Sequence, residues 1–353
     1  MQKIKVAIVG GGYWGQNLIR NFWEVDEAEL TFVCDLDPKA LARAQRRYPT
    51  AQVTRHYREL LDSPRVDAIV LATPVSTHYE FARQALQAGK NVLVEKPLAR
   101  STAEVLDLME LAEQQHKLLM VDHTFLYTSA VRRMKELITR GDIGDMLYFD
   151  SVRINLGLVQ SDINVMWDLA PHDFAILNYL VDSDPVAISA VGARHLGCPY
   201  ENIAYITARY ESSLIAHFHV NWLSPVKVRT TLVGGSSKMI VYDDMESTEK
   251  IKVYDRGFTV NHDPERRERL LTGYRNGDML APNLETTEAL RLMARDFTCA
   301  ILENRQPLSD AISGYRVVRL LEAAQQSIEK NGKEIVLPES AFGRAAKVVT
   351  MRA

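Results

Sequence analysis

The first 120 residues alternate strand and helix signals, and this alternation constrains the fold more than any other feature of the sequence. Each apolar run that predicts a strand is followed by an amphipathic stretch that predicts a helix. The predicted strands are residues 5–10, 30–35, 68–73, 91–95 and 118–123, and the predicted helices are residues 15–24, 38–48, 78–88 and 102–115. This alternation is typical of a doubly wound parallel sheet, so we predict an α/β domain over residues 1–123.

Beyond residue 123 strands follow one another without intervening helices, which predicts an α+β domain with a large, mostly antiparallel sheet. The predicted strands are residues 146–155, 185–194, 203–211, 213–222 and 229–243, and the helices are residues 168–180, 285–303 and 314–332. We assign residues 124–353 to this second domain and leave open that its last helix packs against the first. Residues 255–283 are predicted to form a long loop.

Length and composition exclude several classes of protein. A chain of 353 residues is long enough for two cores. The net charge of −3 argues against a nucleic-acid partner. No apolar run approaches the ~20 residues of a membrane helix. The apolar stretch near the N-terminus is too short for a secretion signal. Three scattered cysteines indicate a reducing compartment. We therefore expect a cytoplasmic protein that binds neither nucleic acid nor membranes.

The segment GGGYWG fits the pattern G-x-G-x-x-G through Gly10, Gly12 and Gly15. Three glycines alone are weak evidence, because a purely structural turn also explains them. Here they follow an apolar strand and open an amphipathic helix, which is the context of a dinucleotide-binding turn. The helix N-terminus then offers free N–H groups to the diphosphate. Tyr13 and Trp14 are candidates to line the nicotinamide pocket, although packing explains them equally well.

Asp35 ends the second predicted strand, 20 residues after the last glycine of the motif. A carboxylate at this position accepts hydrogen bonds from the adenosine ribose hydroxyls and repels a 2′-phosphate. No arginine follows directly in DLDPKA, so NAD(H) is favoured over NADP(H). The alternative is that Asp35 caps the turn before Pro38.

Polar residues also follow the third and fourth predicted strands, in ATPVSTH and NVLVEKPLA. Ligands of doubly wound sheets bind outside the carboxyl ends of the strands. Thr73 and Pro74 are therefore expected to border the cofactor, with His78 at the start of the next helix. Glu95 and Lys96 end the neighbouring strand at the same edge, and a lysine there needs a partner because lysine is rarely buried alone.

With these motifs the sequence resembles the Gfo/Idh/MocA family of nicotinamide-dependent oxidoreductases over nearly its whole length. The matching segments are GGGYWG, the acidic Asp35, the block ATPVSTHYEFARQALQAGKNVLVEKPLA, and WDLAPH at residues 167–172. The resemblance implies that Lys96 lies beside the nicotinamide and the substrate, and that the bond before Pro97 is cis. It also implies that Asp168 and His172 match the family's Asp/His signature, although INVMW precedes them here where many members carry glycines.

Asp168 and His172 are four residues apart and would share one face of a helix. Histidine titrates near neutral pH and suits the role of the base that accepts the hydroxyl proton when a secondary alcohol is oxidised. Asp168 would orient the imidazole, and Lys96 would hydrogen-bond the same substrate oxygen and stabilise developing negative charge. We therefore predict that Lys96, Asp168 and His172 are the catalytic residues of an NAD-dependent dehydrogenase acting on CH–OH groups.

Further substrate contacts are predicted on strands or loops that the family turns toward the cleft. The candidates are Tyr127, Arg153, Asn155, Tyr274 and Arg275. His217 and His219 alternate on one predicted strand, but no other ligand cluster lies near them in sequence, so we predict no metal site.

The start GYWGQNLIRNF is similar to that of family members associated with polysaccharide and amino-sugar biosynthesis. The resemblance implies a nucleotide-linked sugar oxidised at a ring hydroxyl, commonly at C3. The alternatives are an inositol or free-sugar dehydrogenase and, from another class, a sensing protein that binds NAD and a sugar without turnover. By resemblance we also expect a homodimer or homotetramer formed through the second domain's sheet.

Overall fold

The computed structural model describes residues 2–157, 162–260, 272–339 and 342. Contacts divide the chain into two compact units. The first comprises residues 1–128 and 286–322, and the second comprises residues 129–285 and 323–353. Residues 286–322 thus return to the first unit, whereas the sequence placed them with the second domain. The assignment of cofactor binding to one part and substrate binding to the other stays a prediction.

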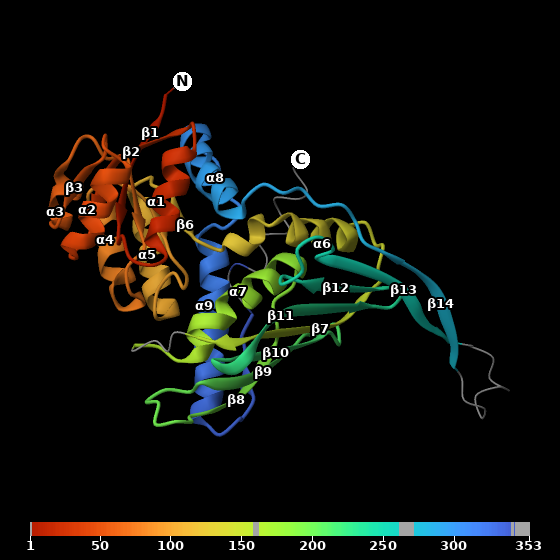
Figure 1. Ribbon diagram of the computed structural model, residues 1–353. Helices are drawn as coiled ribbons and strands as arrows, with labels where there is room; N and C mark the ends of the chain where they lie inside the picture. Colours follow the sequence, from red (N-terminus) through yellow and green to blue (C-terminus); the bar gives the residue numbers. More distant parts are fainter. Residues whose placement is uncertain (1, 158–161, 261–271, 340–341, 343–353) are drawn as a thin grey trace. The chain divides into compact units, whose positions relative to one another are not determined.

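The first unit is built on a parallel sheet with helices packed around it (Figure 1). The sheet has six strands in the order β3-β2-β1-β4-β5-β6. Its strands are β1 (Ile4–Val9), β2 (Ala28–Cys34), β3 (Gln52–Thr54), β4 (Ala68–Leu71), β5 (Asn91–Val94) and β6 (Leu119–Val121). Its helices are α1 (Gly15–Glu24), α2 (Pro38–Arg47), α3 (Tyr57–Asp62), α4 (His78–Gln87), α5 (Thr102–Gln114), α8 (Ala289–Glu303) and the first part of α9 (Ala311–Glu329). This order is that of the Rossmann fold, so the predicted doubly wound sheet is confirmed.

Two elements of this unit escaped the sequence analysis because they are short. Strand β3 has three residues and helix α3 has six, so neither completes a recognisable period. Helix α8 joins the unit from far along the chain and packs against α1. The rings of Phe22 and Phe297 meet edge to face with centroids 6.1 Å apart, and Arg20 pairs with Glu288 at 2.6 Å.

The second unit contains a nine-stranded sheet with the order β14-β13-β12-β11-β7-β10-β9-β8-β15. Strands β7 and β10 run parallel and the other pairs are antiparallel. The strands are β7 (Met146–Leu156), β8 (Ala187–Ala193), β9 (Ile203–Arg209), β10 (Ile215–Asn221), β11 (Leu223–Gly235), β12 (Met239–Asp243), β13 (Ile251–Val260), β14 (Thr272–Leu280) and β15 (Ile335–Val336). The helices are α6 (Ser129–Thr139) and α7 (Val165–Leu180), followed later by the end of α9. The predicted mostly antiparallel sheet is confirmed.

Two predictions for this unit were wrong in detail. The run 229–243 is two strands, because the chain turns back at residues 236–238 and β11 pairs with β12. The predicted loop at 255–283 instead contains the end of β13 and the whole of β14, two strands that pair from Val253 with Leu280 to Val260 with Thr272. Charged and polar residues interrupt the alternation there, so the sequence pattern did not indicate strands. Residues 261–271 lie outside the described residues.

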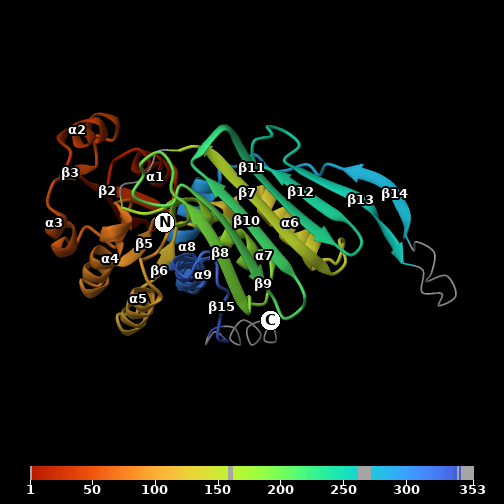
Figure 2. The ribbon, with the colours of Figure 1, turned by 90° about the horizontal axis from the view of Figure 1, so that it is seen from below.

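Helices α6 and α7 lie over one face of this sheet (Figure 1). Phe218 of β10 is the centre of the core beneath α7: its ring meets Phe174 edge to face at 4.8 Å and lies 5.6 Å from Phe149. Figure 2 shows the opposite face, where the strands lie in front of α6 and α7. A row of side chains crosses that face through Val191, Tyr205, His219 and Val152.

Candidate functional site

The glycine-rich turn connects β1 to α1, and two of its three motif glycines are required by close contacts within the protein. Gly10 has a φ of +97°, and a Cβ there would lie 2.3 Å from the carbonyl oxygen of Ala72. A Cβ on Gly15 would lie 1.9 Å from the carbonyl oxygen of Gly10. A Cβ on Gly12, in contrast, would meet no atom within 4 Å. Gly10 and Gly15 therefore allow the turn to close, whereas Gly12 leaves its outer surface open to a ligand.

Asp35 follows β2 and is held by backbone N–H groups. Its Oδ2 accepts from the N–H of Gly11 at 2.5 Å, and its Oδ1 accepts from the N–H of Asp37 at 2.7 Å. The carboxylate is thus fixed beside the glycine-rich turn, as a ribose-binding acid needs to be. The bond from the Asp37 N–H also caps the turn before Pro38, as the alternative role of Asp35 requires, whereas the cap of helix α2 itself is Asp37, whose side chain accepts from the N–H of Lys39.

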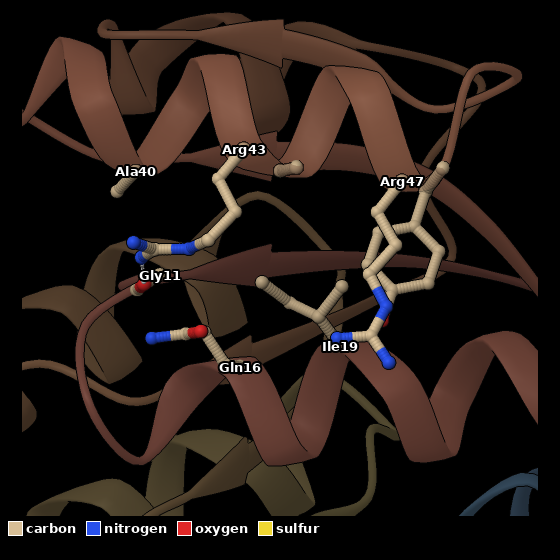
Figure 3. Close-up of a pocket in the computed structure, with 8 residues that line it drawn as sticks. Gly11, Gln16, Ile19, Ala40, Arg43 and Arg47 are labelled. Carbon is tan, nitrogen blue, oxygen red and sulfur yellow. Dashed lines mark hydrogen bonds between the residues drawn. The ribbon is translucent and has the colours of Figure 1, made fainter.

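A shallow pocket lies next to Asp35, between α1 and α2 (Figure 3). Gly11, Gln16 and Ile19 line it from one side, and residues of α2 and its end line it from the other: Ala40, Arg43, Ala44, Arg47 and Tyr48. Arg43 extends across the pocket and donates to the carbonyl oxygen of Gly11 at 2.9 Å. The segment DLDPKA contains no arginine, so the sequence pattern did not indicate Arg43, which helix α2 brings back beside the glycines.

The remaining predicted cofactor residues of this turn and of the loop after β4 differ in exposure. Tyr13 is 83% exposed, and Trp14 is partly exposed with its indole N–H donating to Asp122. Thr73 is half-buried and Pro74 is exposed, and the Thr77 hydroxyl donates to Oγ1 of Thr73 at 2.7 Å. Tyr13 is thus open to a ligand, whereas Trp14 is partly committed to a contact within the unit.

His78 is 1% exposed, so its side chain serves the protein interior. Its Nδ1 lies 2.8 Å from the carbonyl oxygen of Pro97, and its Nε2 lies 2.9 Å from the carbonyl oxygen of Thr73. The imidazole therefore connects the loop after β4 to the turn after β5. The predicted direct contact with a cofactor is not supported by this geometry, which makes His78 a positioning residue for the turn that carries Lys96.

Lys96 stands in that turn, directly after β5. The N–H of Glu95 donates to Leu71 at 2.9 Å and extends the pairing of β4 with β5 by one residue. The bond between Lys96 and Pro97 is cis, as the resemblance implies. Glu95 is 9% exposed, and its carboxylate accepts from the N–H of Lys96 at 3.1 Å. The lysine is thus presented at the carboxyl edge of the sheet by a turn that is fixed on both sides.

In the second unit, Asp168 and His172 lie in the first turns of α7, as predicted. Asn164 caps the helix: its side chain accepts from the N–H of Trp167 at 3.1 Å and donates to Glu201 at 3.0 Å. Pro171 lies inside the helix, near its start. Asp168 also accepts a hydrogen bond of 3.1 Å from the indole N–H of Trp222. The four-residue spacing of Asp168 and His172 puts both on one helix face.

Three predicted substrate contacts are committed to other partners or are half-buried. Tyr127 is 0% exposed, and its hydroxyl donates to Asp296 at 2.7 Å. Arg153 is 3% exposed and forms two hydrogen bonds of 2.8 and 2.9 Å with Asp173. Burial lowers the pKa of Arg153, but the Asp173 carboxylate raises it by more, so the pKa lies above its ordinary value. Asn155 is half-buried, two residues nearer the end of β7.

Removing either member of the buried pair Arg153–Asp173 would leave an uncompensated charge, which typically costs about 3–5 kcal/mol of stability. This geometry makes Arg153 and Tyr127 structural residues, and neither presents a surface to a substrate.

Tyr274 and Arg275 lie on β14, the edge strand of the sheet. Strands β13, β12 and β11 separate it from β7, so these two residues are not brought to the part of the sheet that α7 covers. Arg275 pairs with Asp255 and donates to the carbonyl oxygen of Ser237. The side chain of Tyr274 lies outside the described part of the structure.

His217 and His219 point to the same face of the sheet, as their spacing implies. The ring of Tyr205 stacks on His219 with centroids 4.4 Å apart and on His217 at 6.3 Å. Within the described ranges, no group of three or more His, Cys, Asp or Glu side chains is placed to hold a metal ion. Nor does any helix in those ranges combine the length and the apolar character that crossing a membrane requires.

The parallel sheet, the glycine-rich turn with its acidic neighbour, and a lysine presented at the carboxyl edge define a dinucleotide-binding oxidoreductase. Residues 4–123 match the family model described as an oxidoreductase family with an NAD-binding Rossmann fold. Residues 131–241 match the model of the GFO/IDH/MocA C-terminal domain. The chain belongs to the Gfo/Idh/MocA family, and its first unit contains an NAD-binding domain.

Relatives within the family differ in how much of this chain they match. UDP-N-acetylglucosamine 3-dehydrogenase of Acidithiobacillus ferrooxidans is 26% identical over 93% of this chain and 98% of its own length. Its structure superimposes with a TM-score of 0.79 at 24% identity, covering 94% of this chain and 99% of the other. The structure of levoglucosan dehydrogenase with NADH and levoglucosan gives a TM-score of 0.80 at 20% identity, covering 96% of this chain and 100% of the other.

Other relatives match in part only. An uncharacterised oxidoreductase of Streptococcus pneumoniae is 35% identical, but the match spans 42% of this chain and 40% of the relative. The two superimposed structures, at 24% and 20% identity, show that the fold is shared.

Proposed function

We propose that this protein is an NAD-dependent dehydrogenase that acts on a secondary alcohol of a sugar. The observation that carries the proposal is the Asp168/His172 pair at the capped start of α7, together with Lys96 at the edge of an NAD-binding sheet. A protein that only binds the cofactor has no use for a base and its orienting carboxylate. The family and the match to a sugar dehydrogenase over 93% of the chain support the same reaction class.

The residues of the first unit fit a bound NAD. Gly12 leaves space where a diphosphate approaches the turn, and the fixed carboxylate of Asp35 is available to the adenosine ribose. When bound, NAD supplies the hydride acceptor for the alcohol carbon. Tyr13, Thr73 and Pro74 remain our proposed neighbours of the cofactor, together with the turn at Lys96.

The chain's own groups would handle the proton. His172 would accept it from the substrate hydroxyl, because a neutral imidazole is a base near neutral pH. Asp168, held by Trp222, would orient the ring and stabilise its charged form. The ammonium of Lys96 would hydrogen-bond the same oxygen and stabilise the negative charge that develops on it.

The substrate that we favour is a nucleotide-linked sugar oxidised at a ring hydroxyl such as C3. Support comes from the similarity to UDP-N-acetylglucosamine 3-dehydrogenase, because the match covers 93% of this chain and 98% of that enzyme. The second candidate is a free sugar or cyclitol, and the fold shared with levoglucosan dehydrogenase favours it. A panel of UDP- and TDP-sugars, glucose, levoglucosan and myo-inositol, followed by NADH absorbance, separates the two.

Variants test the catalytic assignment. Lys96→Ala and His172→Ala should each lower kcat by about 10²–10⁴-fold while NAD still binds. The exposed residues Lys39 and His195 offer matched controls, and their alanine variants should keep full turnover. Near-complete activity in both Lys96→Ala and His172→Ala would refute the assignment. Tight NAD binding without turnover of any substrate in the wild type would favour a sensing protein instead.

We also propose that the sheet face of Figure 2 binds a second copy of this chain, in a homodimer or homotetramer. That face carries apolar and aromatic side chains, among them Val152, Ile154, Tyr205 and Ile215, which a monomer would leave exposed to water. The row of side chains through Val191, Tyr205, His219 and Val152 crosses adjacent strands, so this face is continuous. Light scattering should give a mass of two or four chains, and Tyr205→Glu should reduce it to that of one.

A further inference from the structure

Two buried carboxyl groups meet behind the turn that carries Lys96. Strands β5 and β6 are parallel neighbours that pair Val94 with Val121. The next residues of these strands, Glu95 and Asp122, therefore stand side by side at the carboxyl edge of the sheet. Glu95 is 9% exposed and Asp122 is 1% exposed. Their side chains are in hydrogen-bonding contact with each other.

The hydrogen-bond donors around this pair leave one oxygen of each carboxyl group unserved. Glu95 Oε2 accepts from the N–H of Lys96, and Asp122 Oδ1 accepts from the Thr124 hydroxyl. Trp14 donates a further side-chain hydrogen bond to Asp122. Glu95 Oε1 and Asp122 Oδ2 are both buried without a protein donor in the described part of the chain. Two carboxylates that touch in a buried site cannot both be ionised, because like charges repel strongly there.

We propose that Glu95 and Asp122 share one proton at neutral pH, and that this singly charged pair positions Lys96 and balances its charge. Because it assigns a function to the charge of Lys96, the inference rests on the dehydrogenase proposed above. Asp122 is then a positioning residue for the reaction, and the sequence analysis did not single it out. The pair also joins two parts of the site, since Asp122 binds the indole of Trp14 in the glycine-rich turn.

The electrostatics of the cluster agree with a shared proton. Burial, together with the charge of Asp122, raises the pKa of Glu95 well above its usual range. Burial also raises the pKa of Asp122. The ammonium of Lys96 acts in the opposite direction on both groups. His123, the next residue after Asp122, is neutral over the working range because burial lowers its pKa to about 3.

Infrared spectroscopy of the whole protein tests the inference directly, because a protonated carboxyl absorbs apart from ionised carboxylates. The wild type should show a protonated carboxyl at pH 7, and both Glu95→Gln and Asp122→Asn should lose it. Asp310→Asn is the matched control, since Asp310 is a largely buried carboxyl directly before α9 whose side chain is hydrogen-bonded to Ser313, and its removal should leave the signal of the pair intact. Absence of the signal in the wild type, or its persistence in both variants of the pair, would overturn the proposal.

The link to Lys96 has its own test. Because the ammonium lowers the pKa of Glu95, Lys96→Met should move the titration of the infrared signal to higher pH. An unchanged titration would show that Lys96 and the pair are not coupled. Neither measurement needs turnover, so a missing proton and a missing dehydrogenase activity are distinguishable outcomes.

Unfolding measurements provide a second readout. A group whose pKa is raised on folding stabilises the protein at low pH, and this stability is lost as the pH rises through the folded-state pKa. The free energy of unfolding of the wild type should therefore fall as the pH rises from the ordinary pKa of a glutamate to the raised pKa of Glu95 in the folded protein. Glu95→Gln should flatten this decline. An equal decline in the variant would count against the shared proton.

Discussion

The indole N–H of Trp222 donates a hydrogen bond of 3.1 Å to Oδ2 of Asp168. Trp222 lies between β10 and β11 and is 2% exposed, so the donor is held rigidly against the start of α7. The contact fixes the carboxylate that we propose to orient His172. An aromatic residue 54 positions away in sequence thus determines where an acidic side chain of the site points.

Trp222→Phe should lower kcat/KM by about ten- to a hundredfold, because a hydrogen bond to a charged group contributes about 1.5–3 kcal/mol. The pH profile should change as well, since a misoriented carboxylate stabilises the imidazolium of His172 less well. Steady-state kinetics from acid to alkaline pH would measure both effects.

The control for this variant must separate positioning from packing. Phe218→Leu removes volume from the same buried core without touching Asp168. It should lower the thermal midpoint in a similar way but leave the pH profile unchanged. If both variants shift the profile equally, the Trp222 bond has no specific role.

Gly12→Ala should lower the affinity for NAD and spare the fold, whereas Gly15→Ala should lower the stability of the fold. A methyl group at Gly12 meets no protein atom within 4 Å, so the fold should tolerate it, but it occupies the surface that the diphosphate approaches. We expect NAD affinity to fall at least about tenfold, which is about 1.4 kcal/mol.

At Gly15 the methyl group would lie 1.9 Å from the carbonyl oxygen of Gly10, and overpacking of this kind typically costs about 1–3 kcal/mol. Calorimetric titration with NAD and denaturant unfolding would measure the two effects. If Gly12→Ala binds NAD with the affinity of the wild type, the diphosphate does not approach the surface at Gly12.

Asp35→Ser should weaken NAD binding far more than NADP binding, because the substitution removes both the acceptor for the ribose and the charge that repels a 2′-phosphate. Arg43 lies beside the same turn and donates to Gly11, so it is placed to attract a phosphate once the carboxylate is gone.

The double variant Asp35→Ser with Arg43→Ala should therefore lose the NADP binding that the single variant retains. Fluorescence titration of each variant with both cofactors would decide this. Equal losses of NAD and NADP in Asp35→Ser would argue that Asp35 is only structural.

His123 should make the protein sensitive to acid. Burial is the main reason that its pKa falls to about 3 from an ordinary value of 6.5, and the charge of Lys96 lowers it further. The unfolded chain therefore binds a proton more tightly than the folded protein, so stability falls as the pH drops from about 6.5 toward 3.

His123→Leu removes this titration and should weaken the dependence of the unfolding free energy on pH in that range. The exposed His56 provides a comparison, and His56→Gln should leave the acid dependence as in the wild type. Chemical denaturation at a series of pH values would test the prediction, which fails if His123→Leu unfolds with the wild-type pH dependence.

The sequence by itself determined the local features of this protein. The alternation of apolar runs predicted the parallel sheet, and the spacing of Gly10, Gly12, Gly15 and Asp35 predicted the dinucleotide turn, because these residues act within one strand–turn–helix unit. The motif around Lys96 and the four-residue spacing of Asp168 and His172 are also local patterns. Short elements such as β3 were missed since they span less than the period that identifies a strand or helix.

Only the tertiary structure decided which polar side chains meet. It paired Arg153 with Asp173, buried Tyr127 against Asp296, turned His78 inward to Pro97, and brought Trp222 to Asp168 and Glu95 to Asp122. Such contacts depend on strand order and register, which join residues that are distant in the chain. A sequence pattern records the periodicity of one element, whereas the partner of a buried polar group is selected by the packing of several elements together.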